Sequence, residues 1–173
     1  MLYHGSNTFI SGKIVPHKSF HYVPYVYATS DWRYALVRAG RFHINIPLVK
    51  EDYDGNGYTL VELSSGAIDR TFDTAGYIYT VANNLFIKPV NCIPNEFVSC
   101  EACHILTTQH IPNILTLLLH DPYYKIIRYG TAEEKEYWKT VRDGKDGYLL
   151  RRAERVAQMM KGSTTNLEKF RKM

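Results

Sequence analysis

The chain has 173 residues, of which 45% are hydrophobic and 22% are charged. This composition excludes disordered and fibrous classes, and the length favours one globular domain with its own hydrophobic core. Lysine and arginine outnumber aspartate and glutamate by 21 to 17, a net charge of +4. That surplus favours a phosphate-bearing ligand or an acidic partner, but it falls short of the dense basic stripe typical of nucleic-acid binders.

Cysteine usage and hydropathy predict a cytoplasmic protein. Three cysteines, Cys92, Cys100 and Cys103, are an odd number in a chain whose start has no secretory pattern, so reduced thiols are expected. No apolar run approaches the roughly 20 residues that span a bilayer, so no membrane partner is expected.

The first hundred residues are predicted to be mostly β, because β-branched and aromatic residues alternate between turn formers. The expected strands are an opening strand around Tyr3–Ser6, then Lys13–Val15, Tyr22–Ala28, Arg41–Pro47, Tyr58–Ser64, Gly76–Val81 and a strand within Pro94–Cys100. A Gly55-Asn56-Gly57 turn predicts a hairpin-like connection, and Ala67–Thr71 is interpreted as a short irregular link.

A helix is expected directly after the second long strand. Thr29, Ser30 and Asp31 are helix N-cap candidates, and the helical stretch Trp32–Ala39 stops at Gly40.

The second half is predicted to be helical. Helices are expected over Pro112–His120, Ala132–Val141 and Tyr148–Lys161, the last with Arg151, Arg152 and Arg155 on a solvated face. We therefore expect a β core over 1–104 and a helical appendage over 105–173 that packs on it, together forming one domain.

Three short motifs carry the candidate chemistry: His4 beside Gly5, Tyr27 at a strand end, and Glu96 at the start of a late strand. Taken one at a time, an exposed histidine, a core-facing tyrosine and a solvent-facing glutamate are the commoner readings. Their order and neighbours are more informative than any one of them.

Together the motifs resemble the His-Tyr-Glu signature of the ADP-ribosyltransferase superfamily, in its diphtheria-toxin and poly(ADP-ribose) polymerase branch. The matching residues are Tyr3-His4-Gly5-Ser6, Val26-Tyr27-Ala28-Thr29-Ser30 with Ala35 on the following helix, and Asn95-Glu96-Phe97-Val98. The resemblance covers Leu2 to about Cys103. It implies an α+β fold, a split, mostly antiparallel β-sandwich of ADP-ribosyltransferase type whose halves pinch an NAD cleft, with a C-terminal helical appendage.

The resemblance also implies a reaction: NAD is bound as substrate, nicotinamide is released, and ADP-ribose passes to a macromolecular acceptor, protein or nucleic acid. A fixed carboxylate at Glu96 would stabilise the positive charge that develops on the ribose. Tyr27 would stack on the cationic nicotinamide ring, and the main chain of Gly5 would bond its carboxamide. His4, by the family pattern, would hold the adenosine-side ribose.

The sequence departs from the family pattern on the helix after Tyr27. The polymerase branch carries a hydroxyl residue and a second tyrosine there, where this chain has Ala35 and Arg38. Tyr34 or Tyr79 could supply the missing stacking wall. Glu101 competes with Glu96 for the carboxylate role, since an odd offset along one strand would put it on the opposite side; the motif favours Glu96.

Other functions stay open. The departure at Ala35 keeps open a non-catalytic NAD- or nucleotide-binding module. Related folds also perform NAD hydrolysis or RNA 2′-phosphotransfer, the latter with arginines around the phosphate. Cys100, Cys103 and His104 do not predict a metal site, because strand spacing separates the cysteines and no second pair completes four ligands. The sequence lacks a Gly-x-x-x-x-Gly-Lys loop for nucleotide phosphates.

Overall fold

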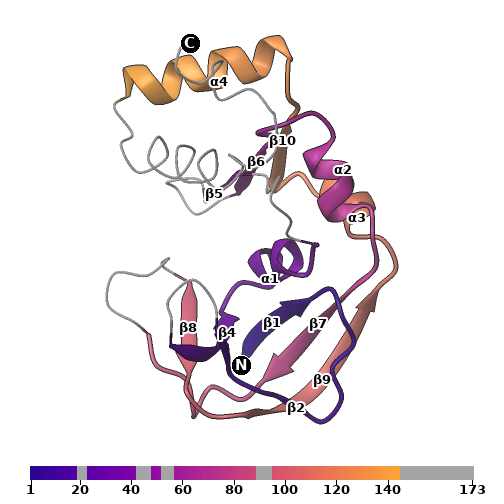
Figure 1. The fold of residues 1–173 in the computed structure, drawn as a ribbon, viewed down its shortest axis with the longest axis vertical. Coiled ribbons are helices and arrows are strands. Elements are labelled where there is room, and N and C mark those ends of the chain that lie inside the picture. The colour runs from indigo at the N-terminus through magenta and orange to yellow at the C-terminus, as the bar shows by residue number, and fades with distance from the viewer. Residues whose placement is uncertain (19–22, 42–47, 52–56, 89–94, 145–173) are drawn as a thin grey trace. The chain divides into compact units, whose positions relative to one another are not determined.

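A computed structural model describes residues 1–18, 23–41, 48–51, 57–88 and 95–144. The chain divides into two compact units (Figure 1), Met1–Arg41 with Thr74–Ile114 and Phe42–Asp73 with Leu115–Met173. Each unit is built from two separate chain segments, and the expected boundary at 104/105 falls inside a strand of the first unit.

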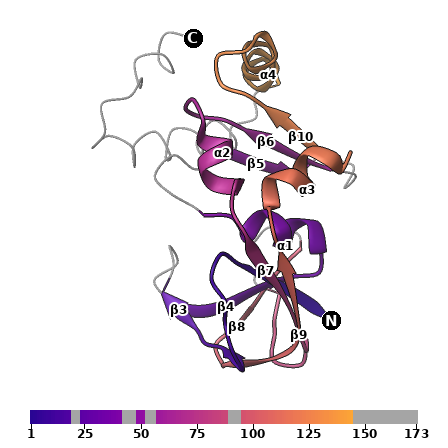
Figure 2. The same cartoon turned by 90° about the vertical axis from the view of Figure 1, so that its right-hand side faces the viewer.

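The first unit contains a curled antiparallel sheet (Figures 1 and 2), which confirms the α+β class. Its strands are β1 (Leu2–Ser6), β2 (Lys13–Ile14), β3 (His17–Lys18), β4 (Pro24–Thr29), β7 (Gly76–Val81), β8 (Glu96–Ser99) and β9 (Cys103–Ile111). The order is β2-β9-β7-β1-β4-β3, and β8 pairs with β4. The N-terminal strand therefore lies inside the sheet, between β7 and β4.

The register assigns side chains to the two faces of this sheet. β1 and β7 pair from Leu2↔Val81 to Ser6↔Tyr77. Since successive strand residues point to opposite faces, one face carries the apolar cluster of this unit. Its buried members are Leu2, Ile14, Val26, Ala28, Tyr79, Val81 and Cys103.

Helix α1 (Trp32–Arg38) packs against β1, β4 and β7 (Figure 1). It begins where predicted, because the Asp31 carboxylate accepts a hydrogen bond from the main-chain N–H of Arg33 at 2.8 Å. Its buried residues are Tyr34, Ala35, Leu36 and Val37. A capped helix follows β4 with two residues between them, as the sequence indicates.

The second unit holds a three-stranded sheet and helices. β5 (Leu48–Glu51) pairs antiparallel with β6 (Tyr58–Val61), and β6 pairs parallel with β10 (Tyr124–Ile127). The helices are α2 (Ala67–Phe72), α3 (Ile114–His120), which starts at the unit boundary, and α4 (Ala132–Asp143). Helix α4 buries Trp138 and Val141 against Val61, Leu63 and Ile127.

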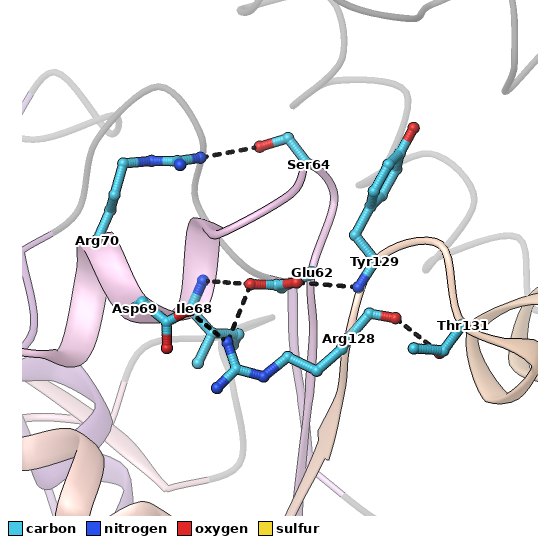
Figure 3. A network of polar contacts seen from close by, with 8 residues as sticks. All are labelled: Glu62, Ser64, Ile68, Asp69, Arg70, Arg128, Tyr129 and Thr131. Atoms are coloured by element: carbon cyan, nitrogen blue, oxygen red, sulfur yellow. Dashed lines mark hydrogen bonds and ion pairs between the residues drawn. The ribbon is translucent and has the colours of Figure 1, made fainter.

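A buried carboxylate organises the second unit (Figure 3). Glu62 is only 3% exposed, and its oxygens accept hydrogen bonds from the main-chain N–H groups of Ile68 at 3.0 Å and Tyr129 at 2.9 Å. The Arg128 guanidinium lies 3.3 Å from the same carboxylate and 2.9 Å from Asp69. Gly66, the N-cap of α2, offers no side chain, so Glu62 satisfies a first-turn N–H from outside the helix.

Several predicted elements are confirmed and others were wrong. β7 spans the expected Gly76–Val81, and α4 covers the expected Ala132–Val141. Ala67–Thr71 is not an irregular link but most of α2, and the stretch after Ile105 opens with the rest of β9 rather than a helix. The predicted helix Tyr148–Lys161, with Arg151, Arg152 and Arg155, and most of the predicted strand Arg41–Pro47 lie outside the described residues.

Candidate functional site

The three sequence motifs lie on adjacent strands of the first unit. β1, with His4 and Gly5, pairs with β4 at Tyr3↔Thr29. β4, with Tyr27, pairs with β8, which begins at Glu96, through Val26↔Ser99 to Thr29↔Glu96. The main-chain N–H of Ser30 also donates to the carbonyl of Asn95 at 3.2 Å. Segments more than 60 residues apart in sequence are thereby joined into β1-β4-β8.

Tyr27 and Glu96 share one face of this sheet. Glu96 lies opposite Thr29, and Val98 lies opposite Tyr27. Opposed residues of antiparallel strands point to the same face, so Glu96 and Tyr27 are diagonal neighbours, a relation that sets residues about 7–8 Å apart. Phe97, opposite Ala28, belongs to the core face instead. Both the Tyr27 ring and the Glu96 carboxylate are half-buried.

Two rings beside Tyr27 were not among the sequence candidates. Tyr25 meets it edge-on, with ring centroids 6.0 Å apart at 86°, and the exposed His17 lies 6.4 Å away at 61°. His17 is paired directly opposite Tyr25, so all three rings lie on the face that carries Glu96. The i, i+2 spacing of two tyrosines in one strand was the signal that could have identified Tyr25.

His4 links β1 to β4 through its side chain. Its Nδ1 donates to the main-chain carbonyl of Tyr27 at 2.7 Å. A carbonyl oxygen only accepts, so Nδ1 carries the proton and Nε2 of the neutral ring is the acceptor. The register places the ring on the core face, 6.2 Å from the ring of Tyr79. Its side chain thus leaves the sheet on the face opposite to Tyr27 and Glu96.

The surroundings of His4 hold its ring neutral. Burial lowers the pKa of His4, and the charges of His17 and Arg38 lower the pKa further, against the raising effect of the hydrogen bond to Tyr27. Arg38, at the end of α1, is therefore close enough to act electrostatically on the motif. The imidazole is suited to accept a hydrogen bond at neutral pH.

Gly5 is required by the packing of α1. A Cβ at this position would overlap the carbonyl oxygen of Ala35 and come within 2.8 Å of the main-chain nitrogen of Ala39. Ala35 itself is fully buried. The absence of a side chain at Gly5 thus lets α1 pack closely against β1. The sequence predicted a close approach at Gly5 too, but by a ligand.

The two tyrosines proposed as a second stacking wall are both buried. Tyr34 is 7% exposed on α1. Tyr79 is fully buried on the core face, and its hydroxyl accepts from the N–H of Ile10 at 2.6 Å and lies 3.3 Å from the carbonyl of Thr8. Tyr25 and His17, rather than Tyr79, are the rings that flank Tyr27.

Glu101 does not share a strand with Glu96. β8 ends at Ser99, and Glu101 is exposed in the bend that follows. The Ser99 hydroxyl accepts from its N–H at 3.1 Å and lies 3.1 Å from its carbonyl, which defines this turn. The expectation that the two glutamates lie on one strand was wrong, because the strand is shorter than predicted.

The cysteines of the same turn differ in surroundings. Cys100 is exposed, whereas Cys103 is buried at the start of β9, where its thiol donates to the carbonyl of Glu101 at 3.3 Å. Burial raises the pKa of the Cys103 thiol, which keeps it protonated. His104 is exposed on the next position of the strand.

Comparison of the chain with protein-family models, curated proteins and solved structures finds no match. None of the helices within the described ranges is long and apolar enough to cross a membrane. The candidate site is therefore defined by its residues: an aromatic cluster and a carboxylate on one face, and the imidazole of His4, which bonds the main chain of Tyr27 from the opposite face.

Proposed function

We propose that the protein binds NAD at β1, β4 and β8 and transfers ADP-ribose to a macromolecular acceptor, with release of nicotinamide. The observation that carries this proposal is the placement of Tyr27 and Glu96 on one face of adjacent strands. A carboxylate beside an aromatic surface suits a ligand that joins a cationic ring to a sugar.

In the proposed reaction, the bond between nicotinamide and C1′ of the ribose breaks and its electron pair leaves with nicotinamide. The ribose then carries oxocarbenium-like positive charge, and an acceptor nucleophile attacks C1′ and loses a proton. Glu96 would stabilise this charge more in the transition state than in the ground state, because the charge develops only as the bond breaks. It would also accept a hydrogen bond from a ribose hydroxyl.

The aromatic cluster would hold the leaving ring. The Tyr27 face would stack on nicotinamide, and its neighbours Tyr25 and His17 restrict its rotation by edge contacts at 6.0 and 6.4 Å. A ring that is already fixed loses little conformational entropy when the ligand binds.

The main chain of β1 would orient the rest of the ligand, and the imidazole of His4 would position Tyr27 from the other face of the sheet. The β1–β4 register is given by the single pair Tyr3↔Thr29, and Gly5 lies two residues beyond it, where a carboxamide could bond its main chain. The His4 ring lies on the opposite face of the sheet, and its hydrogen bond from Nδ1 to the carbonyl of Tyr27 would hold the main chain of β4 behind the Tyr27 ring. Neutral His4 does not repel the cationic ligand.

Ala35 favours a second candidate, a non-catalytic NAD-binding module. This position lacks a hydroxyl and is fully buried beneath Gly5, so the helix offers no polar contact there. Such a module would bind NAD through the same strands without consuming it.

The proposal is tested by measuring nicotinamide release from NAD, with NAD binding followed by calorimetry. We expect Glu96→Gln to lower release by at least about a hundredfold, since a preorganised charge of this kind typically contributes about 10²–10³ in rate, while NAD affinity changes little. Glu101→Gln is the matched control, because Glu101 is exposed in the neighbouring turn.

Equal loss in Glu96→Gln and Glu101→Gln, or full activity in Glu96→Gln, would contradict the assignment of the carboxylate. Binding without release by the wild type, in the presence of acceptor extracts, would support the non-catalytic module instead.

A further inference from the structure

A second aromatic cluster lies on β7, β9 and the loop after β1. Tyr77 on β7 pairs directly opposite His110 on β9, and their ring centroids are 5.1 Å apart at 35°. Phe9, from the loop, meets Tyr77 at 5.4 Å and 65°. We call these three rings the ring platform. None of them belongs to the candidate NAD site.

The ring platform is accessible. Phe9 is 64% exposed and His110 is exposed, while Tyr77 is half-buried and anchors the cluster to the core next to Tyr79, at a centroid distance of 6.3 Å. A single exposed phenylalanine needs no explanation, but Phe9 and His110 each contact Tyr77, so two exposed rings flank a third and together offer aromatic surface to a planar ligand.

Phe9 is held in place from both sides. The N–H of Ile10 donates to the Tyr79 hydroxyl at 2.6 Å, and the same hydroxyl lies 3.3 Å from the carbonyl of Thr8. The N–H of Thr8 donates to the Ser6 hydroxyl at 3.2 Å. An apolar ring is therefore presented to solvent by a loop tied to a buried side chain. Such preorganisation lowers the entropic cost of binding.

The charge of the first unit favours an anionic partner. Met1–Arg41 and Thr74–Ile114 together contain six basic and three acidic residues. Their net charge is therefore +3, out of +4 for the whole chain. The basic residues are Lys13, Lys18, Arg33, Arg38, Arg41 and Lys88, and the acidic ones are Asp31, Glu96 and Glu101. Residues 1–30, 74–95 and 102–114, which contain the ring platform, have no carboxylate side chain.

We propose that the ring platform binds an unpaired base of single-stranded nucleic acid. Bases stack on aromatic side chains irrespective of sequence, and the segments that carry the rings have no carboxylate that would repel a phosphate backbone. A duplex keeps its bases inside the stack, so the same rings offer it no comparable contact. This binding requires no NAD and goes beyond the proposed transfer reaction.

The test measures fluorescence anisotropy of labelled single-stranded DNA and RNA oligonucleotides of equal sequence, with the full chain and no NAD. Loss of one stacked base typically costs about tenfold or more in affinity, so Phe9→Ala is expected to weaken binding by about that factor. Phe9→Leu, which keeps an apolar side chain without a ring, should be as weak, and Phe9→Trp should bind like the wild type. Ile87→Ala removes an apolar side chain of matched exposure, 66%, and should have no effect.

The proposal is supported if single-stranded DNA or RNA binds more strongly than the duplex and the variants change its affinity as stated above. Comparison of the DNA and RNA affinities then shows which nucleic acid is preferred. Three outcomes would overturn it: no binding of single strands by the folded chain, equal affinities for Phe9→Ala and Ile87→Ala, or equally strong binding of the duplex or of poly-glutamate. Circular dichroism of each variant verifies that the fold is intact.

Discussion

His4 contributes to the proposed site only while its imidazole is neutral. Its Nδ1–H donates to the carbonyl of Tyr27, and protonation of Nε2 would place a positive charge near Arg38 and His17. The folded chain resists this protonation, because burial holds the pKa of His4 below its ordinary value of 6.5. Acid should therefore weaken the fold and, with it, the positioning of Tyr27.

The stability consequence has a definite sign. As pH falls below 6.5, the unfolded chain takes up the proton before the folded chain does, so the free energy of unfolding decreases from pH 6.5 down to the lowered pKa and is unaffected by His4 above 6.5. His4→Asn keeps an N–H donor for the Tyr27 carbonyl but cannot titrate. Urea titrations at pH 7.5, 6.5 and 5.5 should show that the free energy of unfolding falls less with decreasing pH in His4→Asn than in the wild type. The other histidines are common to both proteins, and equal slopes would contradict the buried neutral imidazole.

The motifs predicted His4, Tyr27 and Glu96 as candidate site residues, and the structure places the three on adjacent strands. The motifs could not identify His17, because the contact between His17 and Tyr27 depends on the pairing of β3 with β4. The sequence explained the glycine at position 5 only by ligand binding. Its close contact with α1 depends on how the helix packs, which local sequence does not reveal.

At the scale of elements, the stability of α2 depends on a residue outside it. The Glu62 carboxylate accepts hydrogen bonds from the N–H of Ile68 in the first turn, the N–H of Tyr129 and the guanidinium of Arg128 (Figure 3). A carboxylate can accept all three, but an amide offers one oxygen and two N–H donors.

Glu62→Gln should therefore lower the free energy of unfolding by about 1–3 kcal/mol, since one buried donor loses its acceptor. Asp69→Asn is the control: Asp69 is half exposed in its pair with Arg128, and such pairs contribute about 0–1 kcal/mol. Chemical denaturation compares the two variants. An equal, small effect in both would show that the Glu62 contacts do not hold α2 and β10 together.

The same non-local contact explains why α2 was not predicted. Gly66 provides no capping side chain and Ala67–Phe72 is only six residues long, so the local sequence lacks a helix start signal. β9 was missed for a different reason: Leu106–His110 are all exposed, so the strand has no alternation of buried and exposed residues. α1 and β7 were predicted because the Asp31 cap and the aromatic alternation are local.

At the scale of the whole molecule, the chain leaves the first unit after Arg41 and returns to it at Thr74. The sequence has no composition change at either point, and an unbroken β pattern over the first hundred residues predicted one core. Local patterns report which segments are strands, whereas the assignment of strands to sheets depends on pairing between distant segments. The motif residues nevertheless all fall within the first unit.

In the proposed function, β1, β4 and β8 form one NAD site. It is tested most directly by hydrogen exchange of main-chain amides, measured by mass spectrometry on the wild type and on Glu96→Gln with and without saturating NAD. NAD should slow exchange in peptides that cover residues 2–6, 24–29 and 96–99, with little change in peptides from β6 and β10 of the second unit. Unchanged exchange in all three strands, or protection confined to the second unit, would contradict it.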